Sequence, residues 1–126
     1  MSIFRWAFFL LLAGCAGWVR TDLLFGRCKP RPAGAAQCPL VSDEEWQQFV
    51  DREIAPRFSE GFSVVTSEGE WKGSDGIVRE PSKILIVLHH RDPSVSKKLD
   101  EIRDAYKKQF QQDAVMRVDI CAHVAF

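Results

Sequence analysis

The chain has 126 residues, of which 17 are basic and 17 acidic, so its formal net charge is zero. With no excess of positive charge and no basic run, the composition argues against a nucleic acid as the partner. The length suits one compact domain with its own hydrophobic core and is too short for two. The sequence contains no internal repeat and no low-complexity segment.

The N-terminal segment has the pattern of a lipoprotein export signal. An apolar run from residue 6 to residue 11 follows Arg5 and leads through Leu-Ala-Gly to Cys15. A short basic start, an apolar stretch and small residues before a cysteine mark a processed leader, and the run is far below the ~20 residues that cross a bilayer as a helix. We therefore expect residues 1–14 to be a signal peptide and residues 15–20 a short tether. A leader for soluble export and an ordinary first helix are the alternatives.

Acylation of Cys15, with palmitate among the attached chains, would anchor the protein to a membrane. Each buried methylene adds ~0.8 kcal/mol, so several chains hold a protein stably at the surface. The signal is similar to those of Gram-negative lipoproteins, in which a residue other than aspartate after the cysteine, here Ala16, implies transport to the outer membrane. The predicted location is the cell envelope, on the periplasmic face of the outer membrane.

Four cysteines in an exported chain favour disulfides, because the compartment is oxidising. Cys28 and Cys38 bracket a segment rich in proline, glycine and alanine, and a bond between them would close this loop. Such a bond stabilises by ~2–3 kcal/mol through the unfolded state. With Cys15 acylated, Cys121 is then expected to be a free, sheltered thiol. A bond between Cys28 and Cys121, or no disulfide, are the alternatives.

Residues 21–126 are predicted to form the single folded domain. A short apolar run at 21–27 ends at the loop just described and predicts a first strand. Ser42 as N-cap and Glu45 as its capping-box partner predict the start of a helix. This helix is expected to end before Pro56, because the residue preceding a proline is pushed out of the helical region.

Two further strands are predicted at 61–72 and 77–90, joined by a turn that glycines flank. The register that pairs Lys72 with Ile77 places side chains of opposite charge across from each other. Proline cannot donate to a ladder, so Pro81 predicts a bulge or an unpaired edge within the second of these strands.

Asp92 and Pro93 predict the start of a second helix, since an aspartate N-cap followed by proline suits a helix N-terminus. An apolar stripe continues it to Phe110. The last strand, 116–126, alternates apolar and polar residues with period two. Its apolar side chains are expected to face the core, and the opposite face then carries Arg117, Asp119, Cys121 and His123.

The element order predicts an α+β fold of the ferredoxin-like split βαββαβ type, in which two helices cover one face of a four-stranded antiparallel sheet. The other face stays open to water, a ligand or a second subunit. Apolar residues fall on both faces at 23–25 and 84–88, so we expect the open face to be apolar and covered by a second copy in a two-fold homodimer. Arg117 and Asp119 are expected near the rim of that interface, and Cys121 nearer its middle.

Several short motifs follow one another along the domain, and each occurs once. They are Leu24-Phe-Gly26, Ser42-Asp-Glu-Glu-Trp46, Pro56-Arg-Phe58 with Gly61-Phe62, Gly69-Glu-Trp71, Arg79-Glu80, Arg103-Asp-Ala-Tyr-Lys107 and Phe110-Gln-Gln112. Through them the sequence resembles a bacterial family, domain of unknown function 3574, of small exported or lipid-anchored proteins. The resemblance spans nearly the whole mature domain and implies an architecture without an established activity.

Two groups of residues are candidate sites. The first is a ligand or partner face formed by Arg117, Asp119, Cys121 and His123, for which a solvated sheet face is the alternative. The second is a polar cluster of Arg79, Glu80 and Arg103, which ion pairs on the surface would explain equally well.

The sequence offers no catalytic signature. Cys121 and His123 would lie about 7 Å apart along one strand face, too far for a direct hydrogen bond. His89, His90 and His123 do not follow the spacing of a zinc site, and neither a phosphate-binding loop nor a nucleophile elbow is present. We therefore expect no metal, no cofactor and no catalytic residue.

The sequence favours a lipid-anchored envelope protein that serves as a binding or accessory module and is not an enzyme. Its expected partners are the membrane, through the N-terminal lipid, and a second copy of the chain. No feature of the sequence specifies a small-molecule ligand. The alternative is a small enzyme of the dimeric α+β barrel type, with a pocket on the open sheet face.

Overall fold

A computed structural model describes residues 17–126, so the predicted signal peptide and Cys15 lie outside the described residues. The elements in chain order are β1 (Trp18–Gly26), α1 (Asp43–Phe49) with a π-helical continuation (Val50–Ile54), β2 (Ser63–Gly73), β3 (Gly76–His90), α2 (Pro93–Phe110) and β4 (Met116–Ala122). No helix in this part of the chain is both long enough and apolar enough to cross a membrane.

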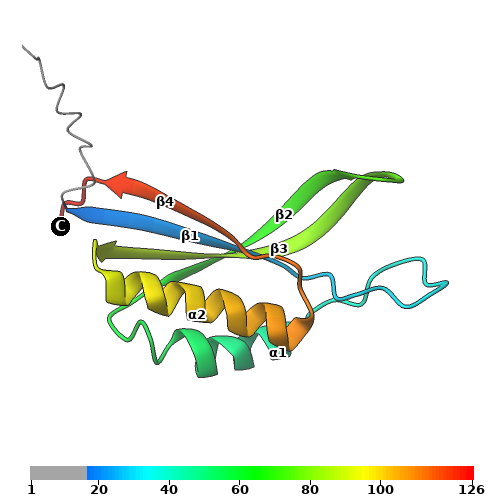
Figure 1. The fold of residues 1–126 in the computed structure, drawn as a ribbon, viewed down its shortest axis with the longest axis horizontal. Coiled ribbons are helices and arrows are strands. Elements are labelled where there is room, and N and C mark those ends of the chain that lie inside the picture. The colour runs from blue at the N-terminus through cyan, green and yellow to red at the C-terminus, as the bar shows by residue number, and fades with distance from the viewer. Residues whose placement is uncertain (1–16) are drawn as a thin grey trace, which may run out of the picture.

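The four strands form one antiparallel sheet in the order β2-β3-β1-β4. Both helices lie against the same face of this sheet, and the opposite face carries no helix (Figure 1). The predicted fold class, a ferredoxin-like α+β fold, is confirmed. We call the uncovered side the open face.

The β2–β3 hairpin has the predicted register. Lys72 lies opposite Ile77, and Glu70 lies opposite Arg79, whose Nε is 2.9 Å from the Glu70 carboxylate. The hairpin extends beyond the end of β1, because the last residue of β1, Gly26, lies opposite Ser82. Its outer half therefore projects as a two-stranded arm beyond β1 (Figure 1).

Of the two outcomes expected at Pro81, the structure shows the unpaired edge and no bulge. Pro81 lies opposite Glu68 in an unbroken β2–β3 ladder. Its carbonyl accepts from the amide of Arg27, 3.0 Å away, on the β1 side. In an antiparallel strand the N–H and C=O of one residue point to the same side. The N–H that proline lacks would have pointed to the side where β1 has just ended. The β2–β3 ladder therefore loses no hydrogen bond at Pro81.

The helices begin where the sequence predicted. Ser42 and Glu45 form the capping box, with the Ser42 hydroxyl accepting from the Glu45 amide and the Glu45 carboxylate accepting from the Ser42 amide. The Asp92 carboxylate caps α2 by accepting from the amide of Ser94. The helical segment that begins with α1 ends just before Pro56, as expected from the restriction on the residue before a proline.

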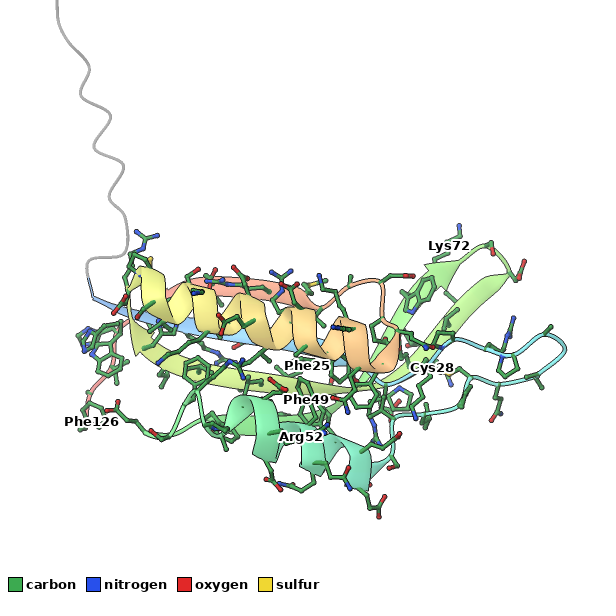
Figure 2. All side chains as sticks on the ribbon, turned by 60° about the horizontal axis from the view of Figure 1, so that its bottom comes forward. Phe25, Cys28, Phe49, Arg52, Lys72 and Phe126 are labelled. Carbon is green, nitrogen blue, oxygen red and sulfur yellow. A yellow bond between two sulfur atoms is a disulfide. The ribbon has the colours of Figure 1, made fainter. Side chains whose placement is uncertain are left out.

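An aromatic cluster joins the two helices to β1. Phe25 of β1 lies edge to face with Trp46, Phe49 and Tyr106, at centroid distances of 4.8 to 6.2 Å, and Tyr106 also contacts Phe110. All five side chains are buried, and Figure 2 shows Phe25 and Phe49 between the sheet and the helices. Aromatic pairs in this geometry contribute about 0.5–1.5 kcal/mol each beyond the area they bury. The cluster therefore fixes the helices on one side of the sheet.

The disulfide predicted between Cys28 and Cys38 is present, with a Cα–Cα distance of 5.4 Å. The backbones of Cys28 and Leu40 also pair in an isolated antiparallel β-bridge, so the two ends of the disulfide loop lie side by side. The expectation of a free thiol at Cys121 is wrong, because Cys121 is disulfide-bonded.

The buried hydroxyl of Tyr106 provides a test of this core. It donates to the carbonyl of Gly26, 2.8 Å away, and burial raises the pKa of Tyr106 above its usual value. Tyr106→Phe keeps the ring and leaves that carbonyl without this donor, so we expect the free energy of unfolding to fall by about 1–2 kcal/mol. Urea denaturation measures this change, and a variant as stable as the wild type would contradict the assigned role of the hydroxyl.

Candidate functional site

The open face is a broad apolar surface. Strand register places Leu24, Ile84 and Val65 in one row across β1, β3 and β2. The neighbouring positions add side chains that are half-buried or exposed, namely Ile86, Leu88, Met116, Val118 and Ile120. Met116 keeps 61% of its surface exposed and Ile120 keeps 50%, so two large apolar side chains on one face of β4 are left in water.

The predicted facing of β4 is wrong. Arg117 lies opposite Leu23, and Asp119 lies opposite Thr21; both β1 residues are buried beneath the helices. The polar row of β4 therefore faces the helix layer, and the apolar row lies on the open face. The cause is the position of β4 at the sheet edge, where long polar side chains can reach the side of α2.

Arg117 makes this contact with α2. Its Nη1 donates to the Ser96 hydroxyl at 3.0 Å and to the Asp100 carboxylate at 3.1 Å, and its Nε donates to Asp119. Burial works against ionisation of Asp100, but hydrogen bonds from Arg103 and Arg117 hold the pKa of Asp100 below its usual value. The contact is a charged link between helix and strand, and it leaves the Arg117 guanidinium occupied.

Asp119 belongs to a second network on the same side of the sheet. The fully buried hydroxyl of Thr21 donates to Asp119 and also contacts His89 Nε2 at 2.8 Å, while His89 Nδ1 lies 2.8 Å from the carbonyl of His90. The His90 carbonyl only accepts, so His89 Nδ1 donates to it, and the Thr21 hydroxyl joins Asp119 to the other side of the His89 ring.

The first candidate site therefore does not lie on the open face. Arg117, Asp119 and Cys121 alternate along the helix side of β4, and His123 follows the end of that strand. Cys121 is disulfide-bonded and so cannot act as a nucleophile in this state.

The second candidate cluster does not converge either. Arg79 pairs with Glu70 on the arm and is largely exposed. The Glu80 carboxylate accepts from the amide of Cys28 at 3.0 Å, which ties the disulfide loop to β3. Arg103 donates to the carbonyl of Val115 at 2.9 Å and holds the turn before β4. Each residue has a separate structural role.

Among residues 17–126 no group of three or more histidine, cysteine, aspartate or glutamate side chains is placed to hold a metal ion.

The sequence did not reveal a cavity of about 750 Å3 at the end of the sheet where the described chain begins. Its walls come from Trp18 of β1, from β3, from the N-terminal part of α2, from the loop that precedes β2, and from the C-terminal tail. Aromatic side chains line much of it, including Trp18, Phe58, Phe62 and Phe126. These positions are scattered along the chain, so no local motif could have linked them.

The open face contains one charged pair. Arg20 and Asp22 lie on β1 between the apolar rows of β3 and β4, and Arg20 Nε is 2.8 Å from the Asp22 carboxylate. The pair is partly exposed and neutral as a unit. A two-fold contact between two such faces would bring equivalent pairs near each other and allow an exchange of partners.

Fold and surface together define a small ferredoxin-like α+β domain with one helix-covered face and one exposed apolar face. The chain belongs to the family described as "Protein of unknown function (DUF3574)", whose model matches residues 20–126. The family assigned from the sequence motifs is thereby confirmed. No curated protein matches the chain.

Solved structures with a similar fold come from different functional classes. CutA from Synechococcus elongatus is 10% identical with a TM-score of 0.51, and the match covers 85% of this chain and 78% of that one. CutA1 from Oryza sativa is 8% identical with a TM-score of 0.56, covering 87% and 84%. A phage SAM lyase in complex with S-methyl-5'-thioadenosine is 17% identical with a TM-score of 0.56, covering 85% and 82%. These similarities concern the fold alone.

The buried Thr21 hydroxyl generates a prediction for the helix side of the sheet. Thr21→Val keeps the shape and removes the group that joins Asp119 to His89, so the free energy of unfolding should fall by about 1–3 kcal/mol. Thr21→Ser retains the hydroxyl and serves as the matched control, with a smaller loss in the same urea titration. Equal losses in the two variants would show that packing, and not the network, is what matters at Thr21.

Proposed function

We propose that this protein is a lipid-anchored module of the bacterial envelope that works by binding other protein surfaces, first of all a second copy of itself. The observation that carries the proposal is the open face, where large apolar side chains of β2, β3 and β4 are exposed and Leu24 of β1 is half-buried. Monomeric soluble proteins rarely expose a contiguous apolar patch of more than a few hundred Å2. A partner that covers this face removes it from water.

A second copy suits the open face better than an unrelated surface. The open face is apolar along β3 and β4, and the Arg20–Asp22 pair lies on β1 between these two strands. A two-fold contact places like against like, so apolar rows meet apolar rows and each charged pair can meet its equivalent. Sheets that pack face to face bury their side chains in a layer about 10 Å thick, as these apolar residues require.

The enzyme alternative loses the residues on which it depended. A dimeric α+β barrel with a pocket on the open face would need polar groups there to act on a substrate. Arg117 and Asp119 instead face α2 and are occupied by Ser96, Asp100 and Thr21. One similar fold is a lyase, but at 17% identity its activity does not transfer to this chain.

The anchor supports the same role. β1 begins at Trp18, three residues after Cys15, so a lipid on that cysteine would hold the domain directly against the bilayer. Trp18 and Phe126 contact each other at the same end of the domain, with ring centroids 6.2 Å apart. Aromatic side chains favour the membrane–water interface. The periplasmic face of the outer membrane is the proposed location, because Ala16 and not an aspartate follows Cys15.

The anchor is tested by replacing the acceptor cysteine. Cys15→Ser removes the sulfur that would carry the lipid, so the protein should leave the membrane fraction or keep its leader. Fractionation and mass spectrometry of the N-terminal peptide measure both effects. Recovery of Cys15 from the wild type in a disulfide-linked peptide would contradict the proposal, because a thioether and a disulfide compete for one sulfur.

The self-association is tested by charging the open face. Ile120→Lys places a charge on the uncovered side of β4, so the dimer should weaken by at least about 100-fold, since burying an unpaired charge costs several kcal/mol. Ile77→Lys is the matched control, because Ile77 is 67% exposed on the projecting arm, away from β4. Sedimentation in density-matched detergent reports the mass. A wild type that is monomeric at tens of micromolar would rule out the dimer.

A further inference from the structure

Part of the β3 edge has no neighbouring strand. The β2–β3 ladder begins with Ser63 opposite Ile86, but β3 continues to His90 and pairs there with β1 alone. A continuing ladder would place Gly61 opposite Leu88. Gly61 instead has a φ of 138°, and the chain turns away from the sheet. An empty strand position therefore adjoins β3 beyond Ile86.

The backbone groups at this position point outward. Arg27 donates to the carbonyl of Pro81, and Arg91 donates to the carbonyl of Gly17, so odd-numbered residues direct their backbone groups toward β1. Even-numbered residues direct theirs to the other side. The carbonyl of His90 accepts from its neighbouring histidine ring. The N–H and C=O of Leu88 and the N–H of His90 are therefore aimed at the empty position.

The cavity described above lies along this edge and extends to both faces of the sheet. On the open side Trp18 stacks on His90, with ring centroids 4.1 Å apart. On the helix side the walls include Phe58, Val87 and Val95. A strand inserted here would direct alternate side chains to these two apolar walls.

We infer that the cavity is a binding site for an extended peptide with apolar side chains, which adds to β3 as a strand. The peptide continues the line of β2 and pairs its backbone with Leu88 and His90, while its side chains contact the walls around Trp18 and Phe58. Backbone hydrogen bonds supply affinity in this mode, and the side-chain pockets supply specificity. The site adjoins the open face, because Ile86 and Leu88 contribute side chains to both.

The edge favours a peptide over a compact apolar ligand. A compact apolar molecule with the volume of such a peptide would contact the apolar walls of the cavity. It would leave the three backbone groups of Leu88 and His90 without hydrogen-bond partners. Burying amide groups without hydrogen-bond partners is unfavourable. A strand satisfies them at the spacing that the β2–β3 ladder already sets.

The test compares three peptides on the full-length protein in detergent. The probe is an acetylated, amidated hexapeptide of alternating valine and threonine, and two further versions carry N-methyl groups on every second amide, in either register. We expect the unmodified probe to slow hydrogen exchange at the amides of Leu88 and His90. One N-methylated register should bind at least tenfold more weakly, because its amides would face β3, and the other should bind nearly as well. Equal binding of all three, or no protection at millimolar probe, would overturn the inference.

A variant of the edge provides the second arm. Leu88→Pro removes the N–H that faces the empty position and leaves the bonds of Val87 and His89 to β1 in place, whereas Leu88→Thr keeps the N–H. We expect the proline variant to lose at least tenfold in probe affinity and the threonine variant to lose less than threefold. Should the proline variant fail to fold by circular dichroism, the N-methyl series on the wild type decides alone. Equal affinity in two folded variants would contradict the strand pairing.

Discussion

Two helices can bury only one face of this sheet, while its strands carry apolar side chains on both. The aromatic cluster around Phe25 fixes the helices on one side, where Trp46, Phe49 and Tyr106 surround that ring. The same strand sends Leu24 to the other side, next to Ile84 of β3. The proposed self-association depends on what covers that second face, because the fold leaves it in water.

The sequence predicted the elements that local physics controls. The capping box at Ser42, the aspartate cap of α2 and the hairpin register at Lys72 all depend on residues within a few positions of each other, and all three are confirmed. The Cys28–Cys38 disulfide closes a short loop and is confirmed as well. Each of these features was predictable because no distant part of the chain competes with it.

Prediction from the sequence was less successful where a side chain or a backbone group could lie on either of two sides of a strand. The alternation of β4 fixed which side chains lie together, but an apolar row fits either face of a sheet that is apolar on both. Arg117 decides the matter through its contacts with Ser96 and Asp100, which only the tertiary structure brings near. Pro81 is similar, since its effect depends on which neighbour its missing N–H would have faced. The cavity could not be predicted because its walls come from five segments that are scattered along the chain.

The domain has two dissimilar ends. The described chain begins at the same end as the C-terminus, whereas the arm and the disulfide loop project at the opposite end (Figure 1). In the proposed arrangement the lipid at Cys15 holds the first end at the membrane, and the arm extends away from it. The peptide site then lies near the bilayer, at one end of the open face, which runs along the length of the domain.

Oxidation of Met116 tests the central claim most directly, namely that the open face is covered in the working protein. Met116 is the only methionine besides Met1, and 61% of its surface is exposed in the isolated domain. Its rate of sulfoxide formation with dilute peroxide can be followed by mass spectrometry over a range of protein concentrations. We predict that the rate falls as the concentration rises, and that Ile120→Lys restores the fast rate. A rate that is equally fast at every concentration would contradict the account.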